Sequence, residues 1–316
     1  MKHIAFASIV ATVLLAAAGA VSYACVPADT RPTPGSLTLT VSPGDGITNG
    51  ITTSDGWTLR FERVLVGIGG VSLDNECSRY SSGRYDRILD LTKGGTQKLA
   101  LVYGIGQCDV RFRLSPPSSD ALLGPGVSEI DKLAMRAPAK DPYIELGGIA
   151  ADIAGSATFG ETTKRFRFLF RPRVRYEDCT AVPDAGPGQP PAAVDLKGED
   201  ALTYDIRIEA EALFRDDQDR NIASIRFAPF ANADTNGDDL VTLEELRAVP
   251  ISTIRDGGAF ETSTFDFDDA GVRTEGPSRL IESLGDYMYL ILAPTMPRFR
   301  ENGVCNADIQ LTPGRN

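Results

Sequence analysis

The sequence predicts a mainly β protein, built as one or more antiparallel β-sandwiches with one or two short helices. Apolar and polar residues alternate in many short segments, which is the pattern of half-buried strands. Short Gly-rich or polar turns separate these segments, and this spacing favours a sandwich or a barrel over βαβ units. The chain has 316 residues, 42% of them hydrophobic, so it is long enough to bury a substantial core.

The predicted strands of the first half begin near residue 57. The segment "GWTLRF" places Trp57, Leu59 and Phe61 on one face. The next segment, "VLVGIGGVSL", is rich in β-branched residues, and its glycines indicate a β-bulge. Further strands are predicted in "RILDL", "KLALVYGI" and "CDVRFRL" and, after the loop "SPPSSDALLGPG", in the meander "YIELGGIAADIAGSATF".

The strand "RFRFLFRPRVRY" carries phenylalanines on one face and arginines on the other, with Pro172 at a bulge or an edge. Arginines between aromatic residues could bind single-stranded nucleic acid. The alternative, favoured by the acidic composition, is an aromatic core face backed by solvated arginines. In that case the expected cross-strand partners of Arg165 and Arg167 are the acids of "TYDIRIEAEALF". These acids are Asp205, Glu209 and Glu211.

Residues 181–194, "AVPDAGPGQPPAAV", are dense in Pro and Gly and predict a linker or a long loop. They divide a β-sandwich domain at 37–180 from a β-rich region at 195–316. In the second region we expect strands in "LTYDIRIEAEALF" and "NIASIRFAPF" and a short helix in "TLEELRAV" that Pro250 ends. A C-terminal helix is expected in "SRLIESLGDYMYLILAPTM", with Ser278 as a candidate N-cap, although its second half could also form a strand.

The first residues have the features of a secretory signal. Lys2 precedes an apolar stretch at residues 4–21, and the small residues before Cys25 suit a signal peptidase, so residues 1–24 are interpreted as a signal peptide. The alternative is an uncleaved membrane anchor, because the apolar stretch is just long enough to span a bilayer.

The segment "VSYAC" resembles a bacterial lipoprotein box, with Ser22 in place of the usual leucine. The resemblance implies that Cys25 is lipidated and anchors the protein to a membrane, with residues 25–36 as a polar, Pro-rich tether. Simple secretion after cleavage is the alternative. We therefore expect an exported protein that is outer membrane-anchored, periplasmic or extracellular.

Four cysteines remain after Cys25, an even number that suits two disulfides in an oxidising compartment. Spacing alone allows three connectivities. We favour Cys77 with Cys108 and Cys179 with Cys305, since the first closes a loop within one sheet region and the second ties the C-terminus to the body.

Charge and composition exclude several function classes. Without Lys2 and the rest of the signal, the chain keeps 31 basic and 43 acidic side chains, a net charge of −12. This charge argues against nucleic acid as a partner and favours cation binding. The only histidine, His3, lies in the signal, which excludes Ser-His-Asp catalysis, Cys-His catalysis and histidine zinc sites.

The stretch "DTNGDDLVTLEEL" begins at Asp234 and has the acidic spacing of a calcium loop. Calcium prefers six to eight oxygen ligands from alternating positions of a tight loop, closed by a bidentate glutamate. The stretch resembles the EF-hand loop and, to a lesser degree, its dockerin-like bacterial relatives. The ligands that the resemblance implies are Asp234, Asn236, Asp238, the Leu240 carbonyl, Thr242 and, as the bidentate ligand, Glu245.

The loop departs from the family pattern in two places. Asp239 stands where the family has glycine, and we expect it to adopt left-handed backbone at a cost of ~1 kcal/mol. Pro229 precedes the loop, so the helix that enters an EF-hand loop is expected to be missing. The alternative to a calcium site is an acidic turn that caps the following helix.

These observations predict an exported, lipid-anchored, non-catalytic calcium-binding protein of the cell envelope with a structural or ligand-binding role. One alternative is a calcium-assisted carbohydrate-binding module that stacks sugars on Trp57, Tyr103, Tyr143 or Tyr287. Another is a carboxylate-based glycoside hydrolase, although no motif singles out two acids for that chemistry.

Overall fold

The computed structural model describes residues 31–93, 95–179, 194–254, 258–260, 266–267, 273–274, 281–300 and 303–311, without the side chains of 145, 266–267 and 273–274. Residues from Pro34 to Asn316 form a single compact unit. The predicted signal peptide, Cys25 and nearly all of the predicted linker lie outside the described residues. Within the described residues, no helix is long and apolar enough to cross a membrane.

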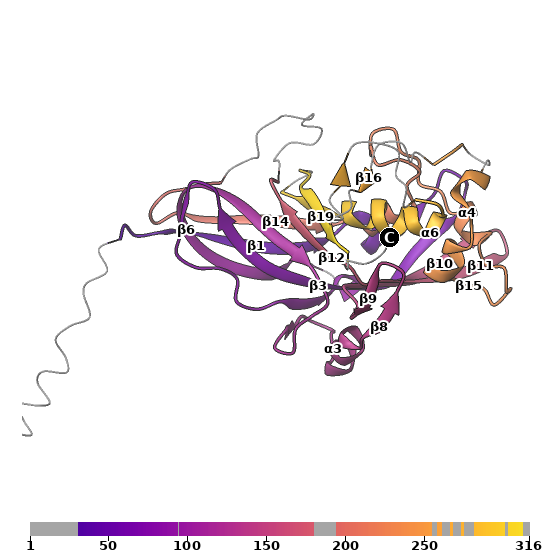
Figure 1. Ribbon diagram of the computed structural model, residues 1–316, viewed down its shortest axis with the longest axis horizontal. Helices are drawn as coiled ribbons and strands as arrows, with labels where there is room; N and C mark the ends of the chain where they lie inside the picture. Colours follow the sequence, from indigo (N-terminus) through magenta and orange to yellow (C-terminus); the bar gives the residue numbers. More distant parts are fainter. Residues whose placement is uncertain are drawn as a thin grey trace, which may run out of the picture. The chain divides into compact units, whose positions relative to one another are not determined.

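The protein is mainly β, as the sequence predicts (Figure 1). The strands are β1 (Gly35–Pro43), β2 (Ile51–Thr52), β3 (Thr58–Asp74), β4 (Cys77–Arg79), β5 (Arg87–Asp90), β6 (Gln97–Leu114), β7 (Leu122–Leu123), β8 (Ala139–Asp141), β9 (Ile144–Gly147), β10 (Ala151–Phe159), β11 (Thr162–Phe170), β12 (Arg173–Glu177), β13 (Val194–Leu196), β14 (Ala201–Ile208), β15 (Leu240–Thr242), β16 (Asp266–Phe267), β17 (Arg273–Thr274), β18 (Pro297–Phe299) and β19 (Asn306–Gln310). The α-helices are α2 (Asp45–Asn49), α3 (Glu129–Arg136), α4 (Ala228–Ala231), α5 (Leu243–Arg247) and α6 (Leu284–Asp286).

One large sheet organises the described residues, with the strand order β15-β11-β10-β3-β6-β1-β14-β18 along its main path. Most neighbouring strands are antiparallel, but β1 pairs with β14, β11 with β15 and β5 with β7 in parallel. The strands on both sides of residues 181–194 share this sheet, since β13 pairs with β6 and Ser36 of β1 lies opposite Ala201 of β14. The predicted regions 37–180 and 195–316 therefore contribute to the same compact unit.

The longest strands, β3 and β6, each combine two segments that the sequence predicts separately. β3 begins at Thr58, just after Trp57 of "GWTLRF", and continues through "VLVGIGGVSL", and β6 runs through both "KLALVYGI" and "CDVRFRL". The register between β3 and β6 shifts between Gly69 and Ser72, as the predicted bulge requires. Gly70 takes a φ of +60° in this bulge, which a residue without a Cβ adopts at little cost.

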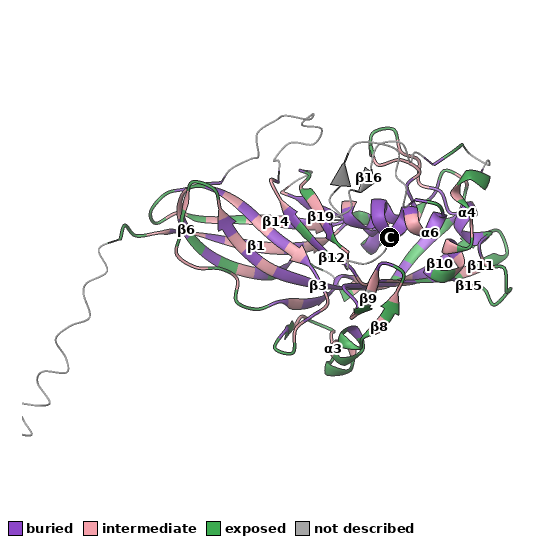
Figure 2. Cartoon of the chain, in the orientation of Figure 1, coloured by how far each residue is buried: buried purple, intermediate pink, exposed green. Residues whose placement is uncertain are grey.

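The hydrophobic core lies along the inward faces of these strands, where buried and exposed residues alternate (Figure 2). An aromatic cluster forms behind β11, as its alternating phenylalanines predict. Its members are Phe61, Phe166, Phe214, Phe227 and Phe230. The ring of Phe166 lies 5.4 Å from that of Phe214 and 6.0 Å from that of Phe227. Burial of each such side chain contributes about 1.5–3 kcal/mol.

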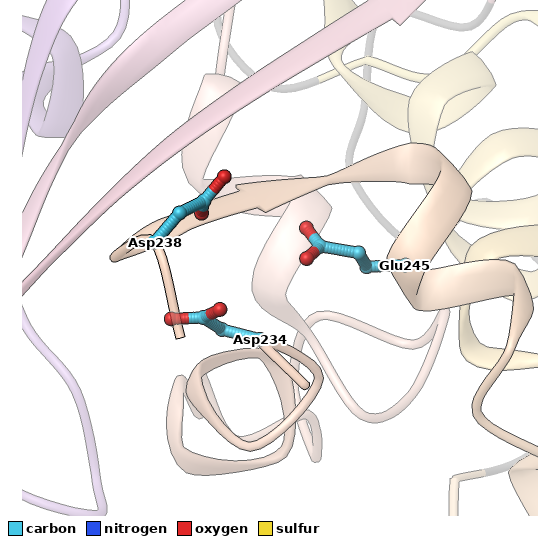
Figure 3. A group of neighbouring side chains, drawn as sticks. All are labelled: Asp234, Asp238 and Glu245. Carbon is cyan, nitrogen blue, oxygen red and sulfur yellow. The ribbon is translucent and has the colours of Figure 1, made fainter. Parts of the chain in front are cut away.

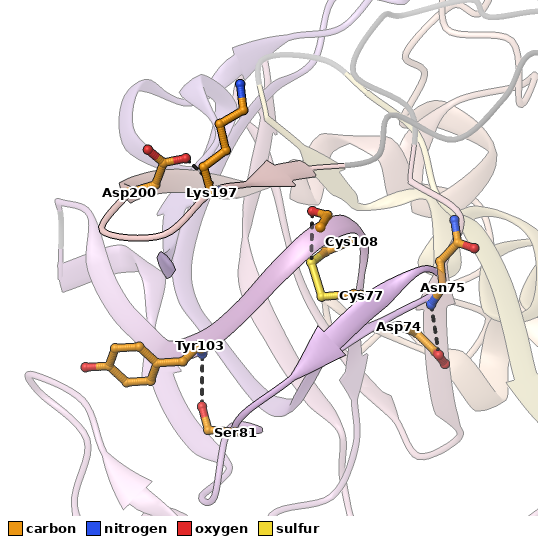
Figure 4. Close-up of a disulfide and its surroundings, with 9 residues drawn as sticks. Asp74, Asn75, Cys77, Ser81, Tyr103, Cys108, Lys197 and Asp200 are labelled. Atoms are coloured by element: carbon orange, nitrogen blue, oxygen red, sulfur yellow. Dashed lines mark hydrogen bonds between the residues drawn. A yellow bond between two sulfur atoms is a disulfide. The ribbon is translucent and has the colours of Figure 1, made fainter. Parts of the chain in front are cut away.

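Two disulfides are formed, with the favoured pairing. Cys77–Cys108 joins β4 to β6 (Figure 4). Cys179–Cys305 lies just beyond the end of β12 and just before β19, the two strands of one antiparallel pair. The second bridge closes a sequence separation of 126 residues and so ties the C-terminal strand to the sheet.

Several element boundaries differ from the sequence prediction. The first strand begins at Gly35, inside the predicted tether, and Val194 belongs to β13 rather than to the linker. The "EAEALF" part of the predicted strand at 202–214 forms a 3-10 turn over Ala210–Phe214. The helix α3 is missing from the prediction; Ser128 caps it in a capping box with Asp131.

The predicted strand "NIASIRFAPF" is wrong. Its residue Ile225 makes only an isolated bridge to Arg215, and the segment then turns into α4. Pro229 explains the change, because proline cannot donate to a sheet but fits the first turn of a helix.

The C-terminal helix begins at Leu284, with Ser283 as its N-cap in place of the predicted Ser278, which lies outside the described residues. It continues as a π-helix over Tyr287–Leu292 and a 3-10 turn over Ala293–Thr295. The second half of the predicted segment is therefore helical and not a strand.

The expected partners of the β11 arginines are also wrong. Arg167 donates two hydrogen bonds, of 3.0 and 2.9 Å, to the buried carboxylate of Asp152 on β10. The predicted partners Asp205, Glu209 and Glu211 lie elsewhere, because β14 neighbours β1 and β18 rather than β11. Asp205 instead accepts a hydrogen bond from Thr40, and Glu209 forms ion pairs with Arg207 and Arg215.

Arg63 connects this network to α3, since it contacts Asp152 at 2.8 Å and Asp131 at 2.9 Å. Hydrogen bonds from Ser128, assisted by Arg63, lower the pKa of Asp131 to about 2. Because this pKa lies below the ordinary value, the ionised carboxylate stabilises the fold above about pH 4. That contribution is lost as the pH falls through about 2.

We expect Asp131→Asn to lower the free energy of unfolding at pH 5 and to lower it much less at pH 2.5. Urea denaturation of both proteins at the two pH values measures the difference. Asp195→Asn, at a carboxyl with a side chain 48% exposed, serves as the control. An Asp131→Asn effect of the same size at both pH values would contradict the assignment.

Candidate metal centre

The loop at 234–245 begins after α4, runs along the edge of the large sheet and ends in the first turn of α5. Its second half forms β15, whose residues Leu240–Thr242 pair in parallel with Arg165–Arg167 of β11. The N–H of Arg165 also donates to the carbonyl of Asp239 at 2.7 Å. The sheet therefore fixes the outgoing half of the loop through backbone hydrogen bonds.

A helix does enter the loop, contrary to the sequence expectation, but it is a single turn. It is α4, whose first turn contains Pro229. The Asp55 carboxylate accepts hydrogen bonds from the N–H groups of Phe227 and Ala228 at 2.8 and 2.7 Å, so it satisfies donors that a helix start leaves open. Phe227 and Phe230 anchor the turn in the aromatic cluster.

The helix that leaves the loop is α5, as predicted. Thr242 is its N-cap, and the Oγ1 of Thr242 accepts a hydrogen bond from the N–H of Glu245 at 3.3 Å. The Glu245 Oε2 accepts hydrogen bonds from the Thr242 N–H and hydroxyl at 2.9 and 3.0 Å. This capping box holds the Glu245 side chain over the loop.

Backbone N–H groups within the loop donate to its own acidic and amide side chains. Asp234 accepts from the N–H groups of Gly237 at 2.8 Å and Asp239 at 3.0 Å. Asp238 accepts from the N–H of Leu240 at 2.9 Å. Asp239 has a φ of +60°, so it adopts the left-handed backbone expected of it.

Three of the predicted ligands converge (Figure 3). Asp234, Asp238 and Glu245 each offer a carboxylate oxygen, and these oxygens lie within 4.8 Å of one another. They occupy the first, fifth and twelfth positions of the loop, the positions that carry carboxylates in calcium loops. In the described part of the chain, no other group of three acidic, Cys or His side chains converges in this way.

The remaining predicted ligands lie in the same loop but are engaged in the local structure. Asn236 accepts a hydrogen bond from the N–H of Asp238 at 2.8 Å, and its Nδ2 donates to the Asp238 carboxylate at 3.3 Å. The Thr242 hydroxyl belongs to the capping box, and Leu240 is a strand residue in β15.

The two oxygens of the Glu245 carboxylate differ in their hydrogen bonding. Its Oε2 makes both cap contacts, whereas its Oε1 is buried and has no hydrogen-bond partner among the described residues. A buried carboxylate oxygen without a partner costs free energy, so a cation beside it is favourable. The Oε1 atom is therefore suited to ligate a metal without loss of the cap.

Lys164 of β11 is the residue at this site that the sequence analysis missed. Its Nζ lies 2.7 Å from the Oδ2 of Asp234 and 2.6 Å from the Oδ1 of Asp239. The hydrogen bond from Lys164, with those from the N–H groups of Gly237 and Asp239, lowers the pKa of Asp234 and keeps this carboxylate ionised. Lys164 lies next to the loop because β15 pairs in parallel with β11. This pairing joins segments far apart in the sequence, so no local sequence pattern predicts it.

The proposed sugar-stacking residues lie mostly in the core. Tyr143 and Tyr287 are 2% and 0% exposed. Trp57 is 8% exposed, with its ring 5.2 Å from that of Phe227. These three rings lack the open face that sugar stacking requires, whereas Tyr103 is 39% exposed.

A cavity of about 440 Å³ lies beyond the end of α5. Its lining residues are Pro142, Arg247, Pro250, Glu282, Ser283 and Asp286. The Asp286 carboxylate accepts a hydrogen bond from the N–H of Ser283, which belongs to the capping box of α6, and another from Tyr143 Oη. This carboxylate therefore stabilises the local structure of the cavity wall.

The left-handed conformation of Asp239 yields a test that does not involve metal. We expect Asp239→Val to be about 1–2 kcal/mol less stable than Asp239→Gly, because a β-branched residue is strained in this backbone region. Both variants lose the contact with Lys164, so their difference isolates the backbone. Denaturant unfolding in the presence of chelator measures it, and equal stabilities would contradict the expected strain.

Comparison of the chain with protein-family models, with curated proteins and with solved structures gives no match.

Proposed function

We propose that the protein is an exported, lipid-anchored, non-catalytic component of the cell envelope whose 234–245 loop binds one Ca²⁺ ion. The observation that carries this proposal is the convergence of Asp234, Asp238 and Glu245 at loop positions one, five and twelve. The bound ion stabilises the fold, and the stabilised surface serves a structural or ligand-binding role.

The donor set favours calcium over other metals. The converging atoms are carboxylate oxygens, which are hard ligands that calcium prefers. Zinc and other transition metals favour histidine nitrogen or cysteine sulfur. After removal of the predicted signal the chain has no histidine, and four of its five cysteines, Cys77, Cys108, Cys179 and Cys305, are in disulfides.

A structural ion suits this loop better than a calcium sensor does. Sensor EF-hands work by changing the angle between two long helices. Here α4 is one turn, held by Asp55 and the aromatic cluster, and the outgoing half of the loop is bound to β11. Calcium at this loop would join α4, β15 and α5 without reorienting them.

The disulfides support export. Such bonds form and persist in oxidising compartments, where Cys77–Cys108 and Cys179–Cys305 would be stable. Lipidation at Cys25 completes the proposal and places the protein at a membrane surface.

We expect millimolar calcium to raise the melting temperature and chelator to lower it. Calcium at a hundred times its Kd adds about 2.7 kcal/mol to the free energy of unfolding. Asp234→Asn should remove the response, because it takes away the first ligand. Asp219→Asn, in an exposed acidic turn, is the control and should keep the response. Identical melts of the wild type in calcium and in chelator would refute the site.

The two tasks of Glu245 are separable. Glu245→Gln keeps a side chain that can complete the capping box, so the free energy of unfolding in chelator should change little. The calcium response should fall strongly, because the amide has no negative charge and leaves an NH₂ group in place of the second carboxylate oxygen, which cannot ligate calcium.

Thr242→Ala is the matched variant for the cap and should lower the stability by about 1 kcal/mol in chelator. Calorimetric melts of both variants, with and without calcium, report both effects. A full calcium response in Glu245→Gln would exclude Glu245 as a ligand.

A further inference from the structure

We propose that Lys164 is a tethered competitor of calcium, whose ammonium group holds the loop in the metal-free state and lowers its affinity for the ion. This inference rests on the proposed calcium site and names the residue that regulates it. The Lys164 Nζ contacts the Oδ2 of Asp234 at 2.7 Å and the Oδ1 of Asp239 at 2.6 Å.

The lysine is placed by the sheet. Its neighbour Arg165 donates its N–H to the Asp239 carbonyl and lies opposite Leu240 in the parallel pair of β11 with β15. On the other side of β11, Lys164 lies opposite Ala157 of β10. The backbone of Lys164 is therefore fixed, and only its side chain can move away from the loop.

The contact between Lys164 and Asp234 is partly buried, whereas the Asp239 side chain on the other side of the ammonium group is 62% exposed. The Asp234 side chain is 0% exposed and that of Lys164 is 18% exposed. Screening by solvent is weaker for such a pair than for a fully exposed one. Asp234 is also the first ligand of the loop, so calcium and the ammonium group would be held by the same carboxylate.

Asp239 gives independent support for this role. It stands at the position where the related loops have glycine, and it does not belong to the three converging carboxylates. Its Oδ1 contacts Lys164 instead. The departure from the family pattern thus supplies a second anchor for the internal cation.

The consequence for binding follows from electrostatics. A doubly charged ion beside the lysine is repelled by it, so Lys164 must withdraw or be tolerated at a cost when calcium binds. Removal of the positive charge should therefore tighten calcium binding by about tenfold. The metal-free loop of the variant should be less stable, because Asp234 and Asp239 lose their counter-ion.

The experiment compares Lys164→Met, Lys164→Arg and Lys197→Met with the wild type by calorimetric titration with CaCl₂. Lys164→Arg keeps the charge and should stay near the wild-type affinity. Lys197→Met causes the same change of net charge at a side chain that is 76% exposed and paired with Asp195, so its affinity should stay within about twofold. Circular dichroism of each variant verifies that it is folded, and Lys164→Gln replaces Lys164→Met if the latter is not.

A calcium affinity about tenfold higher in Lys164→Met than in the wild type, with Lys197→Met unchanged, supports the proposal. Binding by Lys164→Met with no detectable binding by the wild type would show the competition by Lys164 but would refute calcium binding by the wild-type protein. Equal or weaker affinity in Lys164→Met overturns the competition while the calcium site itself stands. Absence of binding in every variant overturns both the calcium site and its regulation.

Discussion

The packing of Phe166 against the aromatic cluster is the constraint on which the loop at 234–245 depends. Phe166 lies on β11 opposite Val241 of β15, and Val241 is fully buried. The same ring contacts Phe227, which immediately precedes α4. One hydrophobic cluster thus holds β11, β15 and the start of α4 together, and this framework presents the carboxylates of the loop.

This framework distinguishes the site from the helix–loop–helix unit that its sequence resembles. A short strand of the large sheet lies between the acidic turn and α5, and the helix that enters the loop has a single turn. Glu245 approaches the other two carboxylates from the first turn of α5, where the capping box with Thr242 holds its side chain. The arrangement of the three carboxylates is therefore set within residues 234–245, whereas the position of the loop is set by its pairing with the sheet.

This division explains how much could be predicted from the sequence. The mainly β class, the alternating faces of β3 and β11, the bulge near Gly70 and the helix at 243–247 all follow from local patterns, and the structure has them. The backbone of Asp239 and the start of α5 at Thr242 were likewise readable from neighbouring residues.

What could not be predicted depends on contacts between distant segments. Because β14 pairs with β1, the acids expected to contact Arg167 lie away from β11. Arg167 contacts Asp152 instead, because β10 lies next to β11. The position of Lys164 depends in the same way on the parallel pair of β11 with β15. Pro229 lies in a segment predicted as a strand that forms the first turn of α4 instead, and the cap from Asp55 that satisfies the start of this helix comes from residues far away in the sequence.

The parallel pair of β1 and β14 has a consequence for the order of events during synthesis. Ser36 lies opposite Ala201, so the first strand has to wait for a partner that is made 165 residues later. At a typical elongation rate this delay is roughly 10–30 s. During that time β1 can pair only with β6, and one of its edges stays open to other chains. This long-range pair is therefore expected to close late in folding, and until β14 docks the open edge of β1 is available to other chains.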